Sequence, residues 1–269
     1  LRLRKDVAIE AGKASIRATA KAAKDLRFSG GLEVRDLAAS RGDQRIAMDA
    51  PITASLAGTI HPAEGLEVEN LSVESSFMRL DGSGNMTGAQ AKAVIDLDAL
   101  TREAGKFIDL GNKEVHGTAE FSLTASQAKK ESEVDFKASA DLKEIILSGI
   151  AAQTISESSL SMEATGTGVL SEGRIRAIRD LNTKLTTDWL QSSLSVTRVD
   201  FRGERPTLIG LRARVQGELN DASSDLLAVL GLPVSAGSFF AEMEAALDKE
   251  ALKFEKLFAR ADGLEFHRG

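Results

Sequence analysis

The sequence of 269 residues has no cysteine and no tyrosine, and aromatic residues make up only 4% of it. Without cysteine, the chain forms neither disulfide bonds nor thiolate metal sites, and it has no cysteine nucleophile. Its net charge of -6 and the lack of a basic tract make it a poor electrostatic match for a phosphate backbone. We therefore expect no nucleic-acid partner.

Long hydrophobic runs are also missing. The longest stretch without a charge runs from Leu226 to Ala241 and is interrupted by Gly231 and Pro233. A membrane-spanning helix needs about 20 consecutive apolar residues, so we expect no such helix here. Because the chain begins at Leu1 and has no apolar run typical of a signal peptide behind it, we interpret it as a piece of a longer protein.

Patterns typical of catalytic sites are absent as well. The three histidines, His61, His116 and His267, are far apart and do not occur in a zinc-binding spacing. No serine lies in a Gly-x-Ser-x-Gly motif. The carboxylates alternate with apolar residues along the expected strands and do not form the pairs that acid–base catalysis needs. We therefore predict a non-enzymatic protein with no metal site and no cofactor.

Most of the sequence alternates between apolar and polar residues, which is the period of a β-strand with one dry face. The alanine-rich segment from Ala14 to Ala22 has a charged or hydroxyl residue at every second position, which would leave a helix without an apolar stripe. We therefore expect a strand there. Similar strands are expected at 119–123, 134–140, 160–164, 194–201, 211–219 and 239–247, and turns at Gly30-Gly31, Gly82-Ser83-Gly84, Gly166 with Gly168, and Asn220-Asp221.

Two segments break this alternation and have helix-cap signals. Residues 98–109 and 221–230 each begin at an aspartate and are followed by a glycine, Gly111 or Gly231. We predict two short helices at these places. Their equivalent positions within similar flanking strands indicate an internal duplication of approximately residues 65–125 and 181–247.

A shorter repeat places apolar residues at positions i, i+2 and i+5. It is clearest in residues 31–37 (GLEVRDL) and 65–71 (GLEVENL), and weaker copies occur at 149–155, 178–181 and 251–257. An extra residue would turn the next side chains to the opposite face, so we predict a β-bulge at Asp36, Asn70 and their equivalents. The alternative is that one strand ends and another begins there.

These features predict a mainly β fold: one continuous repetitive region over residues 1–269, with on the order of 16 strands. An antiparallel sheet of that length must curl, split or close. The expected dry side contains many alanines and few aromatics, which either allows a helix or another sheet to approach closely or leaves room for a ligand. We predict a long, curled, U-shaped antiparallel sheet with two short helices. The alternative is a closed β-sandwich.

The segment from Val94 to Ala125, with its strand, short helix, glycine and strand, and the GLEVRDL and GLEVENL repeats resemble the repetitive β region of AsmA-like proteins, the group that includes TamB. That resemblance implies a periplasmic protein anchored in the inner membrane by a segment not contained in this sequence. It also implies a U-shaped sheet whose apolar groove carries phospholipid towards the outer membrane and so contributes to cell-envelope biogenesis.

On this basis we expect a lipid-transport module that binds phospholipid acyl chains, with inner- and outer-membrane proteins as further candidate partners. A structural or assembly scaffold that binds protein partners is the alternative, and an adhesive or carbohydrate-processing β-domain is a more remote one. The candidate groove residues are Leu32, Val34, Leu66, Val68, Phe121, Leu123, Phe136, Phe239, Met243 and Phe254.

Overall fold

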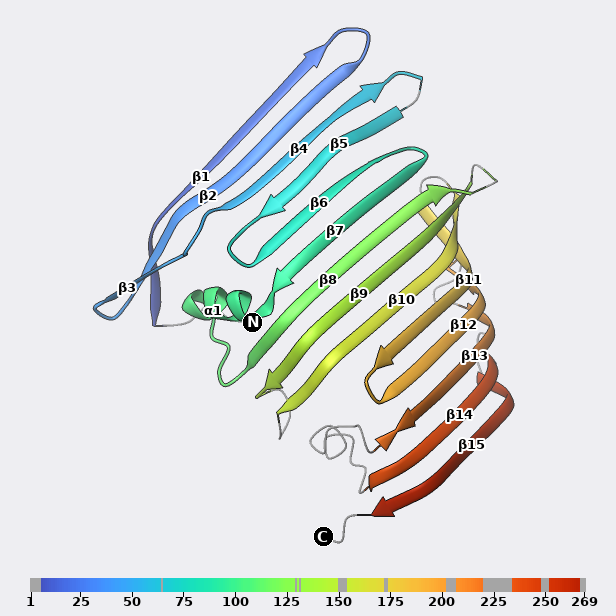
Figure 1. Ribbon diagram of the computed structural model, residues 1–269. Coiled ribbons are helices and arrows are strands. Elements are labelled where there is room, and N and C mark those ends of the chain that lie inside the picture. Colours follow the sequence, from blue (N-terminus) through green and yellow to red (C-terminus); the bar gives the residue numbers. More distant parts are fainter. Residues whose placement is uncertain are drawn as a thin grey trace. The chain divides into compact units, whose positions relative to one another are not determined.

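The computed structural model describes residues 6–63, 65–128, 130, 132–149, 154–171, 174–201, 207–219, 234–247 and 252–266. They form one long antiparallel sheet of 15 strands and one helix (Figure 1). This confirms the predicted mainly β fold. The strands are β1 (Val7–Ala22), β2 (Leu26–Arg41), β3 (Gln44–Ala47), β4 (Ile52–His61), β5 (Gly65–Glu74), β6 (Met78–Asn85), β7 (Gly88–Asp96), β8 (Glu114–Gln127), β9 (Glu133–Ser148), β10 (Ile155–Ser171), β11 (Arg174–Thr187), β12 (Leu190–Asp200), β13 (Thr207–Glu218), β14 (Val234–Leu247) and β15 (Leu252–Phe266), and the helix is α1 (Leu97–Phe107).

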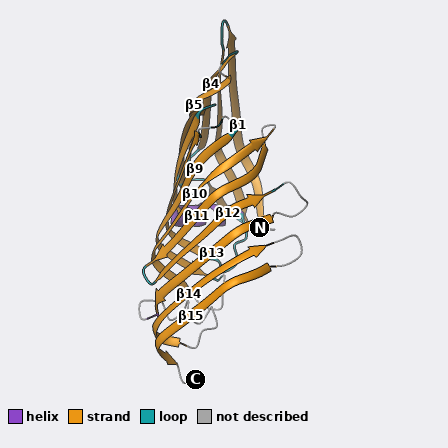
Figure 2. Cartoon of the chain, turned by 90° about the vertical axis from the view of Figure 1, so that its right-hand side faces the viewer, coloured by secondary structure: helices purple, strands orange, loops and turns teal. Residues whose placement is uncertain are grey.

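The chain divides into two compact units. Unit 1 contains Leu1–Ser122 and Ile146–Gly149, and unit 2 contains Leu123–Ile145 and Ile150–Gly269. In unit 1 the strand order is β1-β2-β4-β5-β6-β7, and β3 pairs with β2. In unit 2 the strands β10 to β15 pair in chain order, and they run side by side in Figure 2. Because successive strands are antiparallel neighbours, short hairpins suffice to connect most of them.

The alanine-rich segment is a strand, as predicted. Residues 14–22 belong to β1, where Ile16 lies opposite Leu32 and Ala14 lies opposite Val34 of β2. Directly opposed residues of two strands point to the same face, so the apolar side of β1 continues on β2. Tertiary pairing therefore overrides the high helix propensity of alanine in this segment.

The predicted bulges occur where the repeat placed them. Between β1 and β2 the register shifts where Asp36 adds a residue, and Asp36 has a positive φ of 55°. The register between β4 and β5 shifts at Asn70, so that Val68 and Leu71 remain on one face. Asp180 in β11, with a φ of 51°, is a third example. The register of β15 also shifts next to Lys256, whereas most of the copy at 149–155 lies outside the described residues.

The predicted glycine turns are wrong. Gly30-Gly31, Gly82-Ser83-Gly84 and Gly166 with Gly168 lie inside strands β2, β6 and β10, and Asn220-Asp221 lie outside the described residues. In β10 the glycine leaves space for a neighbouring ring, because a Cβ atom on Gly166 would lie 3.0 Å from the ring of Phe136. A ring that covers a strand glycine in this way shields the exposed backbone.

The same arrangement recurs in both units. A Cβ atom on Gly58 would lie 2.8 Å from the ring of Phe28, which is directly opposite it. A Cβ atom on Gly217 would likewise lie 2.8 Å from Phe239, also its direct partner. These glycines are therefore packing positions of the sheet and not turns.

Helix α1 confirms the first of the two predicted helices, with a shifted start. Its N-cap is Asp96, whose side chain accepts a hydrogen bond from the backbone N–H of Ala99, and not Asp98. Asp98 instead accepts from the backbone N–H of Gly117 and pairs with His116, which ties the helix to the start of β8. The second predicted helix, 221–230, lies outside the described residues, so the internal duplication stays a prediction.

A buried carboxylate holds α1 against the segment that follows β3. Glu103 is 2% exposed and accepts hydrogen bonds from the Nζ atom of Lys106 at 2.9 Å and the backbone N–H of Asp49 at 3.2 Å. Lys106 also donates to the carbonyl of Ala47 and the carboxylate of Asp49. The lysine therefore neutralises a charge that would be costly to bury alone.

Candidate functional site

Each unit has one predominantly apolar sheet face, which we call its apolar face. In unit 1 the register places apolar side chains of neighbouring strands on the same side, because directly opposed residues share a face. The residues of this face are Ile16 of β1, Leu26, Phe28, Leu32 and Val34 of β2, Ile52, Ala54, Leu56 and Ile60 of β4, Leu66, Val68, Leu71 and Val73 of β5, Met78 and Leu80 of β6, and Ala91, Ala93 and Ile95 of β7.

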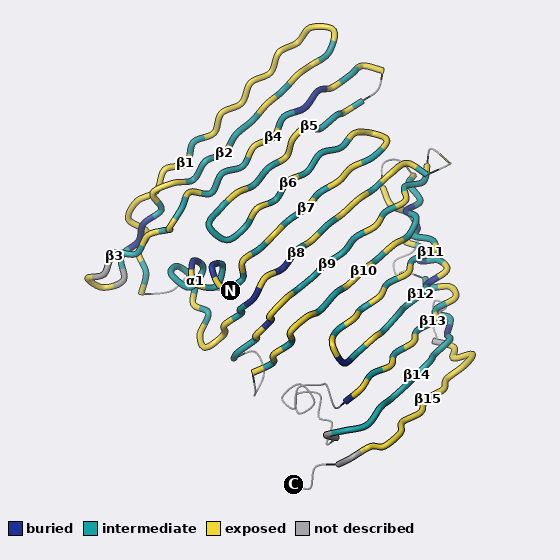
Figure 3. Tube along the Cα trace, viewed as in Figure 1, coloured by how far each residue is buried: buried dark blue, intermediate teal, exposed yellow. Residues whose placement is uncertain are grey.

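Large side chains on this face remain in contact with solvent. Leu32 and Leu56 are each 39% exposed, Ile60 is 42%, Leu66 is 44% and Ile16 is 78% exposed. A large fraction of each of these side chains thus stays accessible to solvent, and Figure 3 shows exposed stretches along β1 and β2. Contiguous exposed apolar surface of this kind is uncommon on soluble proteins, which makes this face the candidate binding surface of unit 1.

The opposite face of unit 1 is polar. Residues that alternate with the apolar set include Ser15, Arg17 and Thr19 of β1 and Ser55 of β4. Farther along, Lys92 of β7 forms an ion pair with Glu120 of β8 at 3.4 Å. The sheet of unit 1 is therefore amphipathic across its width, with one wet side and one dry side.

Unit 2 repeats this organisation. Its apolar face contains Met162 and Ala164 of β10, Ile178, Leu181 and Leu185 of β11, Leu194, Val196 and Val199 of β12, Leu211, Ala213 and Val215 of β13, Phe239, Ala241, Met243 and Ala245 of β14, and Phe254, Leu257, Ala259 and Ala261 of β15. Burial is uneven, because Val196 is 3% exposed whereas Phe254 and Leu257 are 58% and 72% exposed. The most exposed part of this face thus lies on β15, and Met162 of β10, at the other end of the face, is 48% exposed.

Two aromatic residues lie together on the polar face of unit 2. Phe240 of β14 and Phe258 of β15 have ring centroids 5.9 Å apart, and the guanidinium of Arg214 lies 5.5 Å from the centre of the Phe240 ring. Around them, Glu242 forms ion pairs with Arg214 and Lys256. The hydrogen bond from Lys256 holds the pKa of Glu242 below its ordinary value.

All ten predicted groove residues lie on strands. Four of them, Leu32, Val34, Leu66 and Val68, belong to the apolar face of unit 1, and three, Phe239, Met243 and Phe254, belong to that of unit 2. Phe136 of β9 lies against Gly166 of β10. Phe121 and Leu123 are two residues apart on β8 and are 41% and 47% exposed.

Several members of the apolar faces were not predicted. Ile16, Phe28, Leu56 and Ile60 of unit 1 and Leu257 of unit 2 share the faces of the predicted residues. The alternating pattern contained this signal, but the strand pairing was needed to show that they adjoin the predicted residues. Ile16 and Leu257, the most exposed of them, lie on the two end strands of the sheet order.

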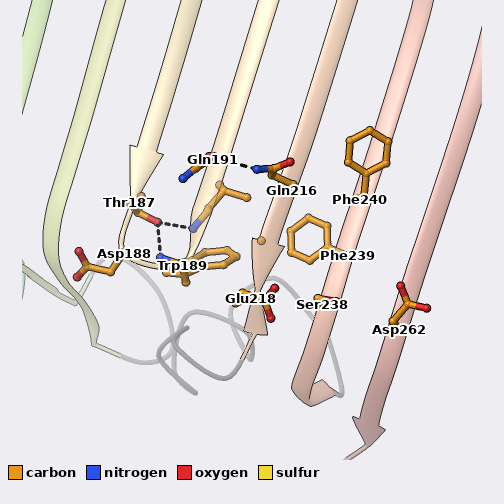
Figure 4. A pocket seen from close by; sticks show the side chains of 12 residues that line it. Thr187, Asp188, Trp189, Gln191, Gln216, Glu218, Ser238, Phe239, Phe240 and Asp262 are labelled. Carbon is orange, nitrogen blue, oxygen red and sulfur yellow. Dashed lines mark hydrogen bonds between the residues drawn. The ribbon is translucent and has the colours of Figure 1, made fainter.

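A pocket of about 380 Å³ lies at one end of strands β11 to β15 (Figure 4). Trp189 forms its wall, is 8% exposed and packs with Leu219, Leu190 and Phe239, which confirms the prediction that the sole tryptophan is a core residue. Its indole Nε1 donates a hydrogen bond to Glu157 at 3.1 Å. Burial raises the pKa of Glu157 above its ordinary value, and the indole hydrogen bond partly offsets that rise. We interpret this pocket as the end of a small packed core.

Polar groups in the described part of the chain do not converge on a metal site, and no described helix is long and apolar enough to span a membrane. His61 contacts Asp25 and Glu67, and His116 contacts Asp98 and Glu114, so both pair with acidic side chains of their surroundings. His267 lies outside the described residues. The feature that stands out chemically is therefore the exposed apolar surface.

The fold defines a long antiparallel sheet with an open apolar face in each unit. Comparisons with family models, curated proteins and solved structures find no match to this chain.

Proposed function

We propose that this chain is a non-enzymatic lipid-binding and lipid-transport module whose apolar faces shield phospholipid acyl chains between the inner and outer membranes. The observation that carries the proposal is the row of large apolar side chains that stay exposed across neighbouring strands, from Ile16 through Leu32 and Leu56 to Leu66 in unit 1. A long antiparallel sheet is also the fold implied by the resemblance to AsmA-like proteins, and the proposed role in the periplasm and in envelope biogenesis rests on that resemblance.

The physical need for such a surface follows from the cost of exposing hydrocarbon to water. Each CH₂ group costs roughly 0.8 kcal/mol to expose, so a phospholipid with some 30 such groups faces a barrier on the order of 25 kcal/mol in an aqueous gap. A continuous apolar face lowers that barrier without bond chemistry. The charged and hydroxyl residues of the opposite face keep such a sheet soluble.

The alternative of a closed β-sandwich scaffold receives less support. A sandwich consists of two sheets whose inner faces fill a shared core with interdigitated side chains. Here the described strands belong to one sheet. Among the described residues, large apolar side chains are more often exposed than buried, since only Ile145, Trp189, Val196, Val199 and Leu219 are buried large ones. An adhesive or carbohydrate-processing function has no such observation in its favour.

Two adjacent residues of β4 provide a matched test. Leu56 lies on the apolar face and is 39% exposed, whereas Ser55 lies on the polar face opposite Gly31 and Ser72. Leu56→Asp places a charge among the apolar side chains, and Ser55→Asp places the same charge in a polar setting. A carboxylate at position 55 also retains the acceptor that the Asn70 amide uses.

The experiment measures co-purified phospholipid by mass spectrometry and transfer of a fluorescent-acyl phospholipid between vesicles. We expect lipid in the wild type and in Ser55→Asp, and a loss of at least tenfold in Leu56→Asp, with all three proteins folded by circular dichroism. Wild-type protein without lipid and without transfer activity would refute the proposal. Equal lipid content in both variants would refute the assignment of this face.

A further inference from the structure

The hairpin of β1 and β2 places like charges directly opposite each other on its polar face. Lys13 is opposite Arg35, and Lys21 is opposite Arg27, while Arg17 lies between them opposite Gly31. Directly opposed residues of antiparallel strands have Cβ atoms about 5 Å apart, so like charges there destabilise the pairing. We call Lys13, Arg17, Lys21, Arg27 and Arg35 the basic strip.

In unit 2, some directly opposed positions of neighbouring strands carry opposite charges. Arg212 lies opposite Glu244 and Arg214 opposite Glu242, and both pairs form ion pairs. Arg179 lies opposite Arg198, and this like-charge pair is compensated. Arg179 contacts Glu133 at 2.6 Å and Arg198 contacts Asp200 at 3.0 Å.

Most of the basic strip lacks that compensation, although Glu33 lies on the same face opposite Ser15 and accepts a hydrogen bond from it. Within the described part of the chain, Lys13 alone among the five has an ion pair, a long contact of 3.8 Å to Asp36, and all five side chains are exposed. Residues 7–41 contain seven basic and four acidic residues, although the whole chain has a net charge of -6. The hairpin is thus a cationic region of an acidic protein, and its charge is complementary to an anionic partner.

The reverse side of the same hairpin indicates that the anionic partner also has apolar groups. There, Ile16 is 78% exposed, Leu26 is 38% and Leu32 is 39% exposed. Strand β1 is also the end strand of the sheet order, so its outer edge is not paired with another described strand. An anionic lipid surface combines both chemistries, because phosphate headgroups attract Lys and Arg while acyl chains accept apolar side chains.

We propose that the basic strip docks the β1–β2 hairpin on the headgroups of an anionic membrane surface. This inference rests on the proposed function and deepens it, because docking there would hold unit 1, whose apolar face is proposed to bind acyl chains, at a membrane surface. The like-charge pairs then serve membrane recognition at the expense of hairpin stability.

The test is sedimentation of the 269-residue protein with vesicles of phosphatidylcholine alone and with 30% phosphatidylglycerol. We expect binding to the anionic vesicles only, weakening between 50 and 300 mM NaCl as headgroup charges are screened. Each basic residue near such a surface contributes about a fivefold gain in binding, so Arg17→Gln/Lys21→Gln/Arg27→Gln loses about 100-fold. The matched control Lys92→Gln/Lys137→Gln/Lys256→Gln removes three cations that have glutamate partners and changes net charge equally; it should lose less than threefold.

A single substitution separates docking from folding. Lys21→Glu converts the pair with Arg27 into opposite charges, so its melting temperature should equal or exceed that of the wild type while vesicle binding falls at least 25-fold. The inference is overturned if Lys21→Glu binds like the wild type or if the triple variant loses no more than its control. Equal binding to neutral vesicles, or equally tight binding to double-stranded DNA, would also overturn it.

Co-purified lipid, measured on the same samples, distinguishes this failure from failure of the proposed function. If docking does not depend on the basic strip but the wild type still carries lipid, the inference alone is wrong. If the wild type carries no lipid, the proposed function is wrong, whatever the vesicle result.

Discussion

The openness of the apolar face can be tested through stability in the absence of lipid. Truncating a fully buried leucine to alanine costs about 2–5 kcal/mol, because transfer energy is lost and a cavity forms. Leu66 is 44% exposed, so roughly half of that transfer energy is already forfeited, and no enclosed cavity forms in its place. We therefore expect Leu66→Ala to cost about 1 kcal/mol. Trp189→Ala, at an 8% exposed site, should cost about 3–5 kcal/mol.

Urea unfolding of lipid-free protein measures both values, with an unchanged m-value as the sign that the unfolding transition is comparable. A loss of 3 kcal/mol or more in Leu66→Ala would show that Leu66 is enclosed, and would refute the idea of an open face. Added lipid provides the converse measurement. A ligand at 100 times its Kd stabilises the wild type by about 2.7 kcal/mol, and Leu66→Ala should lose part of this gain whereas Trp189→Ala should keep it.

Three further predictions concern positions outside the apolar faces. Glu144 has a φ of 53°, so Glu144→Gly should stabilise unit 2 by about 0.5–1 kcal/mol in urea unfolding; destabilisation would contradict this account. Lys106→Met leaves the buried Glu103 with only the longer, 3.9 Å contact to Arg102 and should cost about 2–3 kcal/mol at pH 7, and an unchanged unfolding midpoint would contradict the assigned role of Lys106. The hydrogen bond with Asp98 raises the pKa of His116, so its contribution to stability is complete below the ordinary histidine pKa and is lost as pH rises through the raised value. Unfolding midpoints between pH 5.5 and 9 should show this decline in the wild type and not in His116→Asn.

Periodicity predicted the strands because it reports directly on the two faces of a sheet. The segment 14–22 is the clearest case, since alanine propensity favours a helix and only the alternating polar residues indicate β1. The i, i+2, i+5 spacing was equally informative for the bulges at Asp36 and Asn70. Residues Ala140, Leu142 and Ile145 have the same spacing around the positive φ of Glu144, and that copy was overlooked.

The turns predicted at glycines were wrong because a turn glycine and a strand glycine that makes room for a neighbour cannot be told apart in the sequence. A glycine in a turn is favoured for its backbone freedom, whereas a Cβ atom on Gly58 or Gly217 would collide both with a backbone carbonyl and with a ring on a neighbouring strand. Recognising the second role requires the cross-strand partner, Phe28 or Phe239, which is 30 or 22 positions away in sequence. Strand register is thus the information that local patterns did not contain.

The candidate surface could be predicted only in part for the same reason. Alternation assigned Leu32, Val34, Leu66 and Val68 to dry sides of their strands, but only the register shows that Leu56 of β4 lies between the two pairs. The like-charge pairs Lys13–Arg35 and Lys21–Arg27 are likewise invisible until β1 and β2 are aligned. In sequence they are separated cations in an acidic protein.

The two unusual features of unit 1 have a common physical consequence. An exposed apolar face and an uncompensated basic strip both reduce the stability of the free protein, since neither gives the energy that burial or ion pairing would provide. The apolar face becomes favourable when acyl chains cover Leu56 and Leu66. The basic strip becomes favourable when phosphate groups pair with Arg17 and Lys21. A phospholipid contains acyl chains and a phosphate group in one molecule. If lipid is the partner, binding should therefore stabilise the protein through two separable contributions: one that salt weakens and Lys21→Glu reduces, and one that salt leaves intact and Leu56→Asp reduces. If lipid stabilised Lys21→Glu and Leu56→Asp with the same salt dependence, this division into two contributions would be contradicted.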